Sequence, residues 1–521
     1  MQLEHKAMAA QDSRRSQATA TSNRVESLLF ASGAMYPANI ATIDGRASVD
    51  YQTLCGHAAG FATDLVNSGV SRGDRVAIFL DKTLESVVAL FGTWAAGAVV
   101  VAVNESLRSR QVAHILHDSG SRFLVSTARK LSRLESGAYK HVDIIEPVLR
   151  APGWPINAPS VGISTGNDTQ LAIILYTSGS TGWPKGILTS HANLLAGTRI
   201  VSRYLELQRD ERILSILPFS FDYGLNQLLT AVSAGAALVL LRSHLPADIC
   251  RALAVHEITG CAAVPPLWTQ LMSDFSPFRT MMFPKLRYIT NSGGVFPTDL
   301  VSQYRKHLPQ ARIYLMYGLS EAFRSTYLPP ELIDARPGSI GKAIPETEIF
   351  VANQYGNECA AGEVGELVHR GPTVAMGYWN DPDATALVFR PDTLPGGNVN
   401  RNVVFSGDLV KKDEDGFLYF VGRADKMIKS QGYRISPEEI EDLIRSSQLV
   451  SQVVVCGKAD PQSGAVIVAH VVPRAAQPFN KQALISYCQR EMPSYMQPRQ
   501  IVVHQQLPRT ASGKIDRRSL E

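Results

Sequence analysis

The chain has 521 residues, which is too long for a single hydrophobic core and indicates two or more domains. Hydrophobic residues make up 45% and charged residues 19%, and no apolar run is long enough to span a membrane, so no membrane partner is expected. The net charge of +4 is too close to balance to favour nucleic acid as the main partner.

The N-terminal residues 1–25 are polar, carry several arginines and lack an apolar stretch. They predict a disordered tail rather than a secretion signal. The six cysteines are scattered and do not have the spacing of metal ligands. They are expected to be reduced thiols of a cytoplasmic protein.

Helical and strand-like patterns alternate in the first part of the chain. Residues 51–68 and 83–96 have apolar residues at helical spacing, whereas 75–80 and 99–103 are apolar runs typical of buried strands. This alternation predicts an α/β domain in which helices cover both faces of a sheet. Strands of a second α/β layer are expected at residues 213–218, 236–241, 261–264, 287–290 and 313–316.

Short apolar runs between glycines at residues 338–419 favour a small β-rich subdomain. Beyond it, an α+β pattern begins, with helices expected at 437–446 and 481–490 and strands at 452–455 and 466–472. We therefore expect a core domain over residues 26–424 and a compact, mobile C-terminal α+β domain over 425–521.

Residues 175–186 form a glycine-rich stretch between an apolar strand and a helix expected near Ser190. Its glycines allow close approach of the backbone to an anion, its hydroxyls add donors and Lys185 adds a positive charge. The pattern differs from a P-loop, because Pro184 and Gly186 stand where that motif needs glycine and a hydroxyl. The stretch predicts a polyphosphate-binding loop, and the alternative is a flexible surface linker.

Seven motifs in this order and spacing resemble the AMP-forming adenylating superfamily, which includes acyl-CoA ligases, adenylation domains of nonribosomal peptide synthetases and luciferase-like enzymes. The motifs are residues 176–186, 291–294, 317–321, 406–408, 422–425, 429–441 and 508–514. The resemblance covers residues 25–520, nearly the whole chain.

The resemblance implies that ATP and Mg²⁺ are used and that a carboxylate attacks the α-phosphate. Catalysis is then mainly positioning and charge stabilisation. The resemblance assigns catalytic roles to Lys514, Glu321 and Thr177, with Glu321 and Thr177 at the metal. The implied ATP-binding residues are Thr177, Ser178, Gly179, Ser180, Thr181, Gly182, Lys185, Gly293, Gly294, Tyr317, Gly318, Ser320, Asp408 and Arg423.

A second half-reaction is also implied, in which the C-terminal domain swings about a hinge and a thiol accepts the acyl group. Asp425 matches the hinge position, and Gly432 and Arg434 lie on the segment that would line the thiol tunnel. The acceptor would be a carrier protein acting in trans or coenzyme A. Residues 497–521 carry five basic and two acidic residues, a net of +3, which fits either acceptor.

Three residues bear on the acid that is activated. Asp222 stands where ordinary fatty or aryl ligases of the superfamily carry a His-containing segment, and an aspartate there is typical of members that activate amino acids. Arg324 and Ser292 lie on segments that line the acyl pocket in the superfamily, where Lys514 would also contact the substrate. An aspartate for an ammonium and an arginine for a second carboxylate together indicate an amino dicarboxylic acid.

Asp222, Ser292 and Arg324 resemble the stand-alone β-amino-acid adenylation enzymes of macrolactam polyketide pathways, of the vicenistatin type that acts on 3-methylaspartate. Three alternatives stay open. Asp222 could cap a helix, Arg324 could pair with a surface acid, and the chain could then be a ligase for an ordinary carboxylic acid. A non-catalytic adenylate-binding module is the alternative outside the enzymes.

Overall fold

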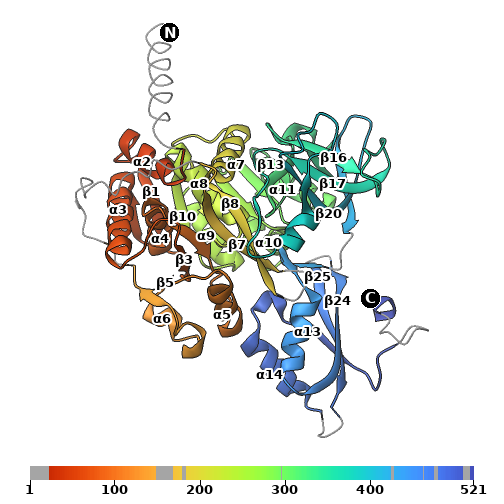
Figure 1. Cartoon of the computed structure of the whole chain (residues 1–521). Helices are drawn as coiled ribbons and strands as arrows, with labels where there is room; N and C mark the ends of the chain where they lie inside the picture. Colours follow the sequence, from red (N-terminus) through yellow and green to blue (C-terminus); the bar gives the residue numbers. More distant parts are fainter. Residues whose placement is uncertain are drawn as a thin grey trace.

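The computed structural model describes residues 23–147, 149, 168–178, 183–294, 296–423, 427–460, 463–474, 479–508 and 517–520. Two β-sheets with helices around and between them form the larger part of the molecule. Residues from 427 onward form a smaller α+β unit, which lies below the sheets in the view of Figure 1.

The first sheet has seven strands in the order β18-β8-β7-β4-β3-β5-β6. They are β3 Arg75–Ile78, β4 Val99–Ala102, β5 Phe123–Val125, β6 Asp143–Ile145, β7 Leu171–Ser178, β8 Pro184–Ser190 and β18 Gly377–Tyr378. β7 runs parallel to β4 and antiparallel to β8, and the register of this hairpin pairs Thr177 with Lys185. The two ends of the predicted phosphate loop are therefore neighbours.

The second sheet has fourteen strands, in the order β16-β17-β20-β21-β15-β14-β13-β12-β11-β9-β10-β1-β2, with β19 paired to β20. They are β1 Ile40–Asp44, β2 Ala47–Asp50, β9 Arg212–Ser215, β10 Ala237–Leu240, β11 Gly260–Ala263, β12 Tyr288–Asn291, β13 Arg312–Leu319, β14 Ala322–Leu328, β15 Ser339–Ala343, β16 Glu348–Ala352, β17 Val364–Arg370, β19 Phe389–Pro391, β20 Asn402–Lys412 and β21 Leu418–Arg423. The predicted β-rich segment thus continues the large sheet through antiparallel pairs.

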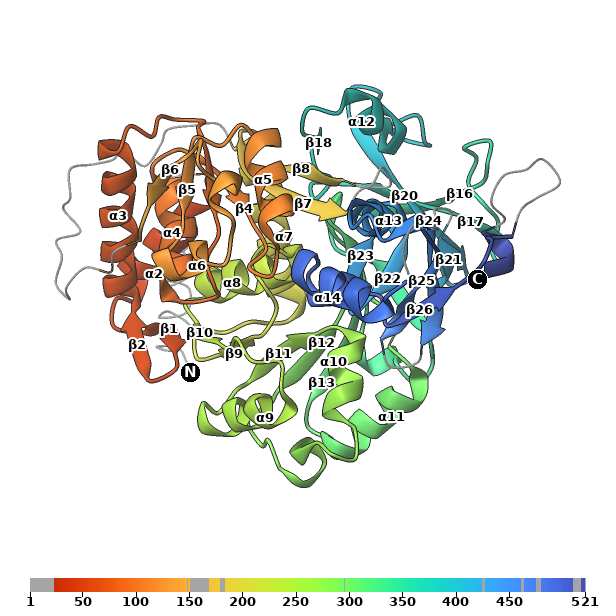
Figure 2. The ribbon, with the colours of Figure 1, turned by 90° about the horizontal axis from the view of Figure 1, so that it is seen from below.

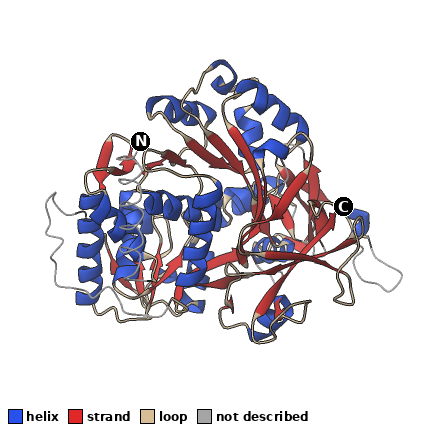
Figure 3. Ribbon diagram, turned by 90° about the horizontal axis from the view of Figure 1, so that it is seen from above, coloured by secondary structure: helices blue, strands red, loops and turns tan. Residues whose placement is uncertain are grey.

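Helices surround both sheets, as Figure 3 shows. They are α2 Glu26–Met35, α3 Tyr51–Asn67, α4 Leu84–Ala95, α5 Ser109–Asp118, α6 Ala128–Leu131, α7 His191–Tyr204, α8 Asp222–Ala234, α9 Pro246–Val255, α10 Pro265–Leu271, α11 Thr298–His307 and α12 Pro382–Val388. α4 contacts β3 and β1, and α7 contacts β7 and β14, so both helices lie between the sheets. One large apolar cluster fills this space.

Local sequence explains where the helices next to the site begin and end. At the start of α7, the Asn193 N–H donates to the Ser190 hydroxyl and the Ser190 N–H donates to the Asn193 side chain. α8 begins at Asp222 and stops at Gly235, whose φ of 72° is the left-handed conformation that glycine adopts without strain. The turn between β9 and α8 contains a hydrogen bond from the Phe221 N–H to the Pro218 carbonyl at 3.2 Å, directly before α8 begins.

The C-terminal unit has its own sheets and its own core. Its elements are β22 Ile428–Ser430, β23 Tyr433–Ile435, α13 Pro437–Ser446, β24 Val450–Asp460, β25 Gly464–Pro473, α14 Lys481–Glu491 and β26 Gln500–Val503. α13 and α14 pack their apolar side chains on the β24-β25-β26 sheet. β23 contacts β7, and Figure 2 shows this unit facing the β7–β8 hairpin.

The predicted fold class is confirmed, while some predicted boundaries are wrong. Arg24 and Val25, assigned to the tail, are buried, and Arg24 Nε lies 2.8 Å from Glu26 Oε1. β24 is much longer than residues 452–455 because β25 pairs along it. All six cysteines are buried and lie outside disulfide bonds. Within the described ranges, no helix is long and apolar enough to cross a membrane. The domain boundary at Asp425 stays a prediction, because that residue lies outside the described ones.

Candidate active site

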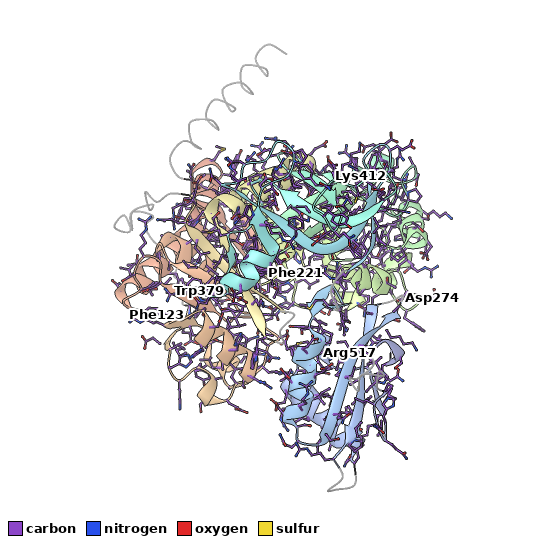
Figure 4. All side chains as sticks on the ribbon, turned by 45° about the vertical axis from the view of Figure 1, so that its right-hand side comes forward. Phe123, Phe221, Asp274, Trp379, Lys412 and Arg517 are labelled. Atoms are coloured by element: carbon purple, nitrogen blue, oxygen red, sulfur yellow. The ribbon has the colours of Figure 1, made fainter. Side chains whose placement is uncertain are left out.

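One pocket lies where strands β7, β12 and β13 end and helix α8 begins, at the junction with the C-terminal unit. Figure 4 labels Phe221 near this junction. The predicted site residues that line the pocket are Thr177, Asp222, Ser292, Gly293, Gly318, Ser320, Glu321, Arg324, Asp408, Arg423 and Gly432. Residues separated by more than two hundred positions in the chain are thus brought to one place.

A buried ion pair forms part of the pocket wall. Arg324 Nη1, from β14, lies 3.6 Å from Asp222 Oδ2, and the side chains are only 2% and 4% exposed. The Arg324 guanidinium also lies over the ring of Tyr223, 4.7 Å from its centroid. Arg324 is therefore not in a surface salt bridge. Asp222 is not a helix N-cap either, since that position is held by Phe221.

This pair leaves hydrogen-bonding capacity unused. Nε and Nη2 of Arg324 are buried and have no hydrogen-bond partner among the described residues. Burial raises the pKa of the Asp222 carboxyl, and the nearby guanidinium of Arg324 opposes this shift. Each unpaired buried donor costs about 1–3 kcal/mol, so a ligand that supplies an acceptor to Arg324 would be favoured. Ser292 is also buried and lines the same pocket.

Glu321 is held by a tyrosine that the sequence analysis did not single out. The Tyr378 hydroxyl donates to Glu321 Oε1 at 2.8 Å. Tyr378 belongs to the two-residue strand β18, which pairs with β8 beside the predicted phosphate loop. Lys185 Nζ lies 5.6 Å from the centroid of the Tyr378 ring and 2.9 Å from Asp381 Oδ2. A single tyrosine thus joins the neighbourhoods of Glu321 and Lys185.

Glu321 and Thr177 both line the pocket, and Glu321 is 4% exposed. In the described parts of the chain, no group of three or more His, Cys, Asp or Glu side chains could hold a metal ion. Mg²⁺ needs only one or two protein carboxylates when phosphate oxygens supply other ligands. One buried carboxylate beside a hydroxyl therefore fits Mg²⁺ that arrives with a nucleotide.

Asp408 is fixed by two neighbours. The Tyr317 hydroxyl donates to Oδ2 of Asp408, and Arg423 forms an ion pair with Oδ1. Behind Tyr317, the His369 ring is stacked on it with centroids 6.1 Å apart. Burial raises the pKa of Tyr317 well above its usual value and lowers that of His369 to about 3, so both are neutral. Asp408 is a rigidly held acceptor at the pocket wall.

The C-terminal unit supplies part of the wall as well. Gly432, with φ of 83°, approaches Val264 so closely that a Cβ atom there would lie 2.8 Å from Val264 Cγ1. Next to it, Tyr433 is stacked on Tyr495, with centroids 3.8 Å apart, and on Phe221, at 6.4 Å. In this arrangement the C-terminal unit covers the pocket beside Asp222.

Some predicted site residues do not line the pocket, and others lie outside the described residues. Lys185, Gly294 and Tyr317 are described but lie outside the pocket wall. Predictions that lie outside the described residues concern Gly179, Ser180, Thr181, Gly182, Asp425, Lys514 and the side chains of Ser178 and Arg434.

The sequence analysis missed Tyr378, Tyr433 and Tyr495. Tyr433 stands directly after Gly432 in one of the matched motifs, which is a signal that could have drawn attention to it. Tyr378 and Tyr495 lie outside every motif, and no pattern in the sequence marks them.

Comparison with family models gives two matches. The model described as AMP-binding enzyme matches residues 29–379, and the model of the AMP-binding enzyme C-terminal domain matches residues 439–514.

Similar proteins include a very large synthase and an enzyme of comparable length. The chain is 30% identical to tyrocidine synthase 3 of Brevibacillus parabrevis over 93% of its own length, but spans only 7% of that protein. It is 30% identical to a long-chain-fatty-acid–CoA ligase of Salmonella typhimurium, covering 87% of this chain and 86% of the ligase.

Among solved structures, a double mutant of o-succinylbenzoate CoA synthetase from Bacillus subtilis, bound with a product analogue, is similar with a TM-score of 0.81. It is 27% identical, and the match covers 95% of this chain and 98% of that one. The same synthetase is also known in complex with ATP and magnesium ion, at a TM-score of 0.67 and 27% identity over 95% of this chain and 98% of that one.

Proposed function

The chain belongs to the family of AMP-binding enzymes, and from this premise we propose that it adenylates a β-amino dicarboxylic acid such as 3-methylaspartate. As a member of the family it is an AMP-forming acid ligase that uses ATP and Mg²⁺. The proposed acid, the residue roles and the carrier-protein acceptor go beyond this and are argued from the pocket.

The observation that carries the proposal is the buried Asp222–Arg324 pair. Arg324 has two buried nitrogens without acceptors, and Asp222 is a carboxylate in a desolvated place. A carboxylate on the substrate would satisfy Arg324, while an ammonium would pair with Asp222. An alkyl chain in the same place would leave these two buried nitrogens of Arg324 without an acceptor, which is expensive in a buried site.

The reaction then proceeds by displacement at the α-phosphorus. An oxygen of the second substrate carboxylate forms a bond to this phosphorus, the bond to the bridging oxygen of the β-phosphate breaks, and pyrophosphate leaves. Glu321 and Thr177 would hold Mg²⁺, which offsets phosphate charge when bound. Asp408 would accept hydrogen bonds from the ribose hydroxyls, and Lys514 would place its charge between the carboxylate and the α-phosphate.

In the second half-reaction, a thiol would attack the acyl carbon and AMP would leave. We assign the thiol to the phosphopantetheine arm of a separate acyl carrier protein. The net charge of +3 over residues 497–521 fits an acidic carrier protein, as it also fits the phosphates of coenzyme A. Asp425 is proposed as the hinge, so Asp425→Pro should spare adenylate formation and block transfer. Loss of both half-reactions in this variant would refute the hinge.

The substrate is tested by ATP–pyrophosphate exchange with 3-methylaspartate, aspartate, β-alanine, β-phenylalanine and a medium-chain fatty acid. We expect exchange with the two dicarboxylates, and we expect Arg324→Ala to lower kcat/KM for them about 10- to 100-fold, as for the loss of a charge-assisted hydrogen bond. β-Alanine, which has no second carboxylate, should be little affected by the variant.

Arg24→Ala is the matched control, because Arg24 is another arginine that is 2% exposed and pairs with a buried acid, outside the pocket wall. It reports the cost of removing a buried arginine without touching the acyl site. Strong exchange with the fatty acid and indifference to Arg324→Ala would mean that the proposed substrate is wrong while the adenylating activity stands.

A further inference from the structure

The last described segment of the chain, residues 517–520, is bound to the rest of the C-terminal unit by a bidentate ion pair. Arg517 Nη1 lies 2.8 Å from Glu441 Oε1, and Arg517 Nη2 donates to Glu441 Oε2 at 2.9 Å. Figure 4 shows Arg517 within this unit. A guanidinium that binds both carboxylate oxygens in this way fixes orientation as well as distance.

The Glu441 carboxylate is held in place by contacts other than the one with Arg517. It lies on α13 with its side chain 1% exposed, and its Oε1 also accepts the N–H of Val455 on β24, at 2.8 Å. Arg445 donates to Oε2 at 2.9 Å from one helical turn further along. The carboxylate therefore joins α13, β24 and the segment at residues 517–520, and two of its contacts, with Arg445 and Val455, do not depend on Arg517.

A second contact holds the same end of the chain. The Sγ atom of Cys456, on β24, lies 3.4 Å from the carbonyl oxygen of Leu520. Because Glu441 contacts Arg517 and Cys456 contacts Leu520, the segment at residues 517–520 is anchored at two points, one on α13 and one on β24.

The anchor lies close in sequence to the lysine of the proposed adenylation site. Three peptide units separate Lys514 from Arg517, so covalent geometry limits the distance between their Cα atoms to about 11 Å. With Arg517 held by Glu441, the Cα atom of Lys514 is therefore confined to within about 11 Å of a point fixed on the C-terminal unit. Such confinement raises the effective concentration of the lysine.

We propose that the Glu441–Arg517 pair is a tether that positions Lys514 for adenylate formation, with Arg517 as a positioning residue. The inference rests on the proposed function, in which Lys514 acts on the α-phosphate. The tether lowers the entropy that Lys514 must lose on entering the site. It moves with the C-terminal unit, because both of its partners belong to that unit.

The test compares Arg517→Ala with Arg445→Ala. Both variants remove an arginine from the same buried carboxylate oxygen, but only Arg517 lies in the segment that carries Lys514. We expect Arg517→Ala to lower kcat of ATP–pyrophosphate exchange at least about tenfold while KM for ATP, AMP affinity and the melting temperature stay near those of the unmodified protein. The acid is whichever member of the panel gives the highest exchange.

Arg445→Ala should keep kcat within about twofold of the unmodified protein. The kcat of Arg517→Lys should lie between those of Arg517→Ala and the unmodified protein, because lysine retains the charge but not the bidentate geometry. Unchanged kcat in Arg517→Ala would overturn the tether. An equal loss in Arg445→Ala would overturn it too, since it would trace the effect to the burial of Glu441. If Arg517→Ala does not fold, the same comparison is made with Arg517→Lys.

Lys514→Ala is measured alongside. If it abolishes exchange and Arg517→Ala does not lower it, the tether alone is wrong. If Lys514→Ala retains exchange, the role of Lys514 in the proposed function is wrong, and the tether falls with it.

Discussion

If Asp222 pairs with the substrate ammonium, as proposed, its protonation makes substrate binding depend on pH. Burial raises its pKa, so it takes up a proton at a higher pH than an exposed aspartate, although Arg324 opposes the shift. An ammonium group binds only the ionised carboxylate. The affinity for an amino substrate should therefore fall as the pH falls through this raised pKa, in a window above the usual value of 3.8.

The same group has the opposite effect on folding. A raised pKa in the folded state means that the folded protein binds the proton more tightly, so this contribution to stability is present below the raised pKa and is lost as the pH rises through it. KM for the amino acid should thus rise on acidification without loss of stability from Asp222. Asp222→Asn should bind weakly at every pH and remove this dependence. A pH profile of KM that is the same in both proteins would show that Asp222 does not meet the ammonium.

Tyr378 connects the Glu321 carboxylate to the strand beside the phosphate loop. Tyr378→Phe removes the 2.8 Å hydrogen bond and keeps the ring against Phe389, with centroids 5.5 Å apart. The loss of one hydrogen bond to a charged group costs about 1.5–3 kcal/mol. Part of this should appear as a several-fold increase in the Mg²⁺ concentration for half-maximal exchange, because Glu321 is then less well oriented.

Tyr51→Phe is the control for this variant. The Tyr51 hydroxyl donates to the carbonyl of Ala236 at 2.7 Å, in the core and away from the pocket wall. It should lower stability without changing the Mg²⁺ requirement. If Tyr378→Phe leaves the Mg²⁺ titration unchanged, Glu321 does not hold the ion through this arrangement.

At the scale of elements, sequence patterns predicted the strands and helices that carry the pocket, because each has a strong local signal. The apolar run before Thr177 and the helix after Ser190 are examples, and they correspond to β7 and α7. β18 could not be predicted in this way. It has two residues and exists only because Gly377 and Tyr378 pair with β8, so no periodic pattern marks it.

The contact between Asp222 and Arg324 could not be predicted from the sequence either. Each was assigned to the acyl pocket as a separate binding group, whereas the structure brings them within 3.6 Å of each other. They come from α8 and β14, which are about a hundred residues apart in the chain. Only the packing of α8 near β14 determines this distance, and residue types alone carry no information about it.

Arg110 contacts residues on both sides of the junction between the larger part of the molecule and the C-terminal unit. It lies on α5, its guanidinium is 4.7 Å from the Trp183 ring centroid, and its Nη1 donates to the Ser446 hydroxyl on α13 at 3.1 Å. Arg110→Ala should therefore free both the start of the β8 strand and the end of α13. We expect faster amide hydrogen exchange in β8 after Pro184, which itself has no N–H, and at the last turn of α13.

Ser446→Ala separates the two contacts of Arg110, because it removes only the hydrogen bond to α13. It should speed exchange in α13 and leave the β8 strand as in the unmodified protein. Each exposed contact contributes about 0.5–1 kcal/mol, so exchange should change a few-fold rather than by orders of magnitude. Unchanged exchange at β8 in Arg110→Ala would mean that the arginine does not restrain Trp183.

At the scale of the whole molecule, the apolar core of the C-terminal unit shares no side chain with the apolar cores of the larger part, among the described residues. The main core lies between the sheets, and a second core lies within the C-terminal unit around Ile440, Leu443 and Val455. Contacts between the two parts are made by a few side chains, such as Tyr433 with Phe221. Separate cores joined by so few contacts are expected to unfold in separate steps.

The distribution of tryptophan makes these steps separable by spectroscopy. All five tryptophans precede residue 380, so their fluorescence reports only the larger part, whereas far-UV circular dichroism reports both parts. Ile440→Ala removes a side chain that is fully buried in the second core. Such a substitution costs about 2–5 kcal/mol, so the denaturation step of the C-terminal unit should move to lower urea concentration. The fluorescence transition and AMP affinity should stay unchanged.

Leu228→Ala, at a fully buried position of the main core, should have the converse effect. A shift of both transitions together in Ile440→Ala would mean that the two cores unfold as one cooperative unit, and the C-terminal unit would then be too firmly attached to swing independently between half-reactions.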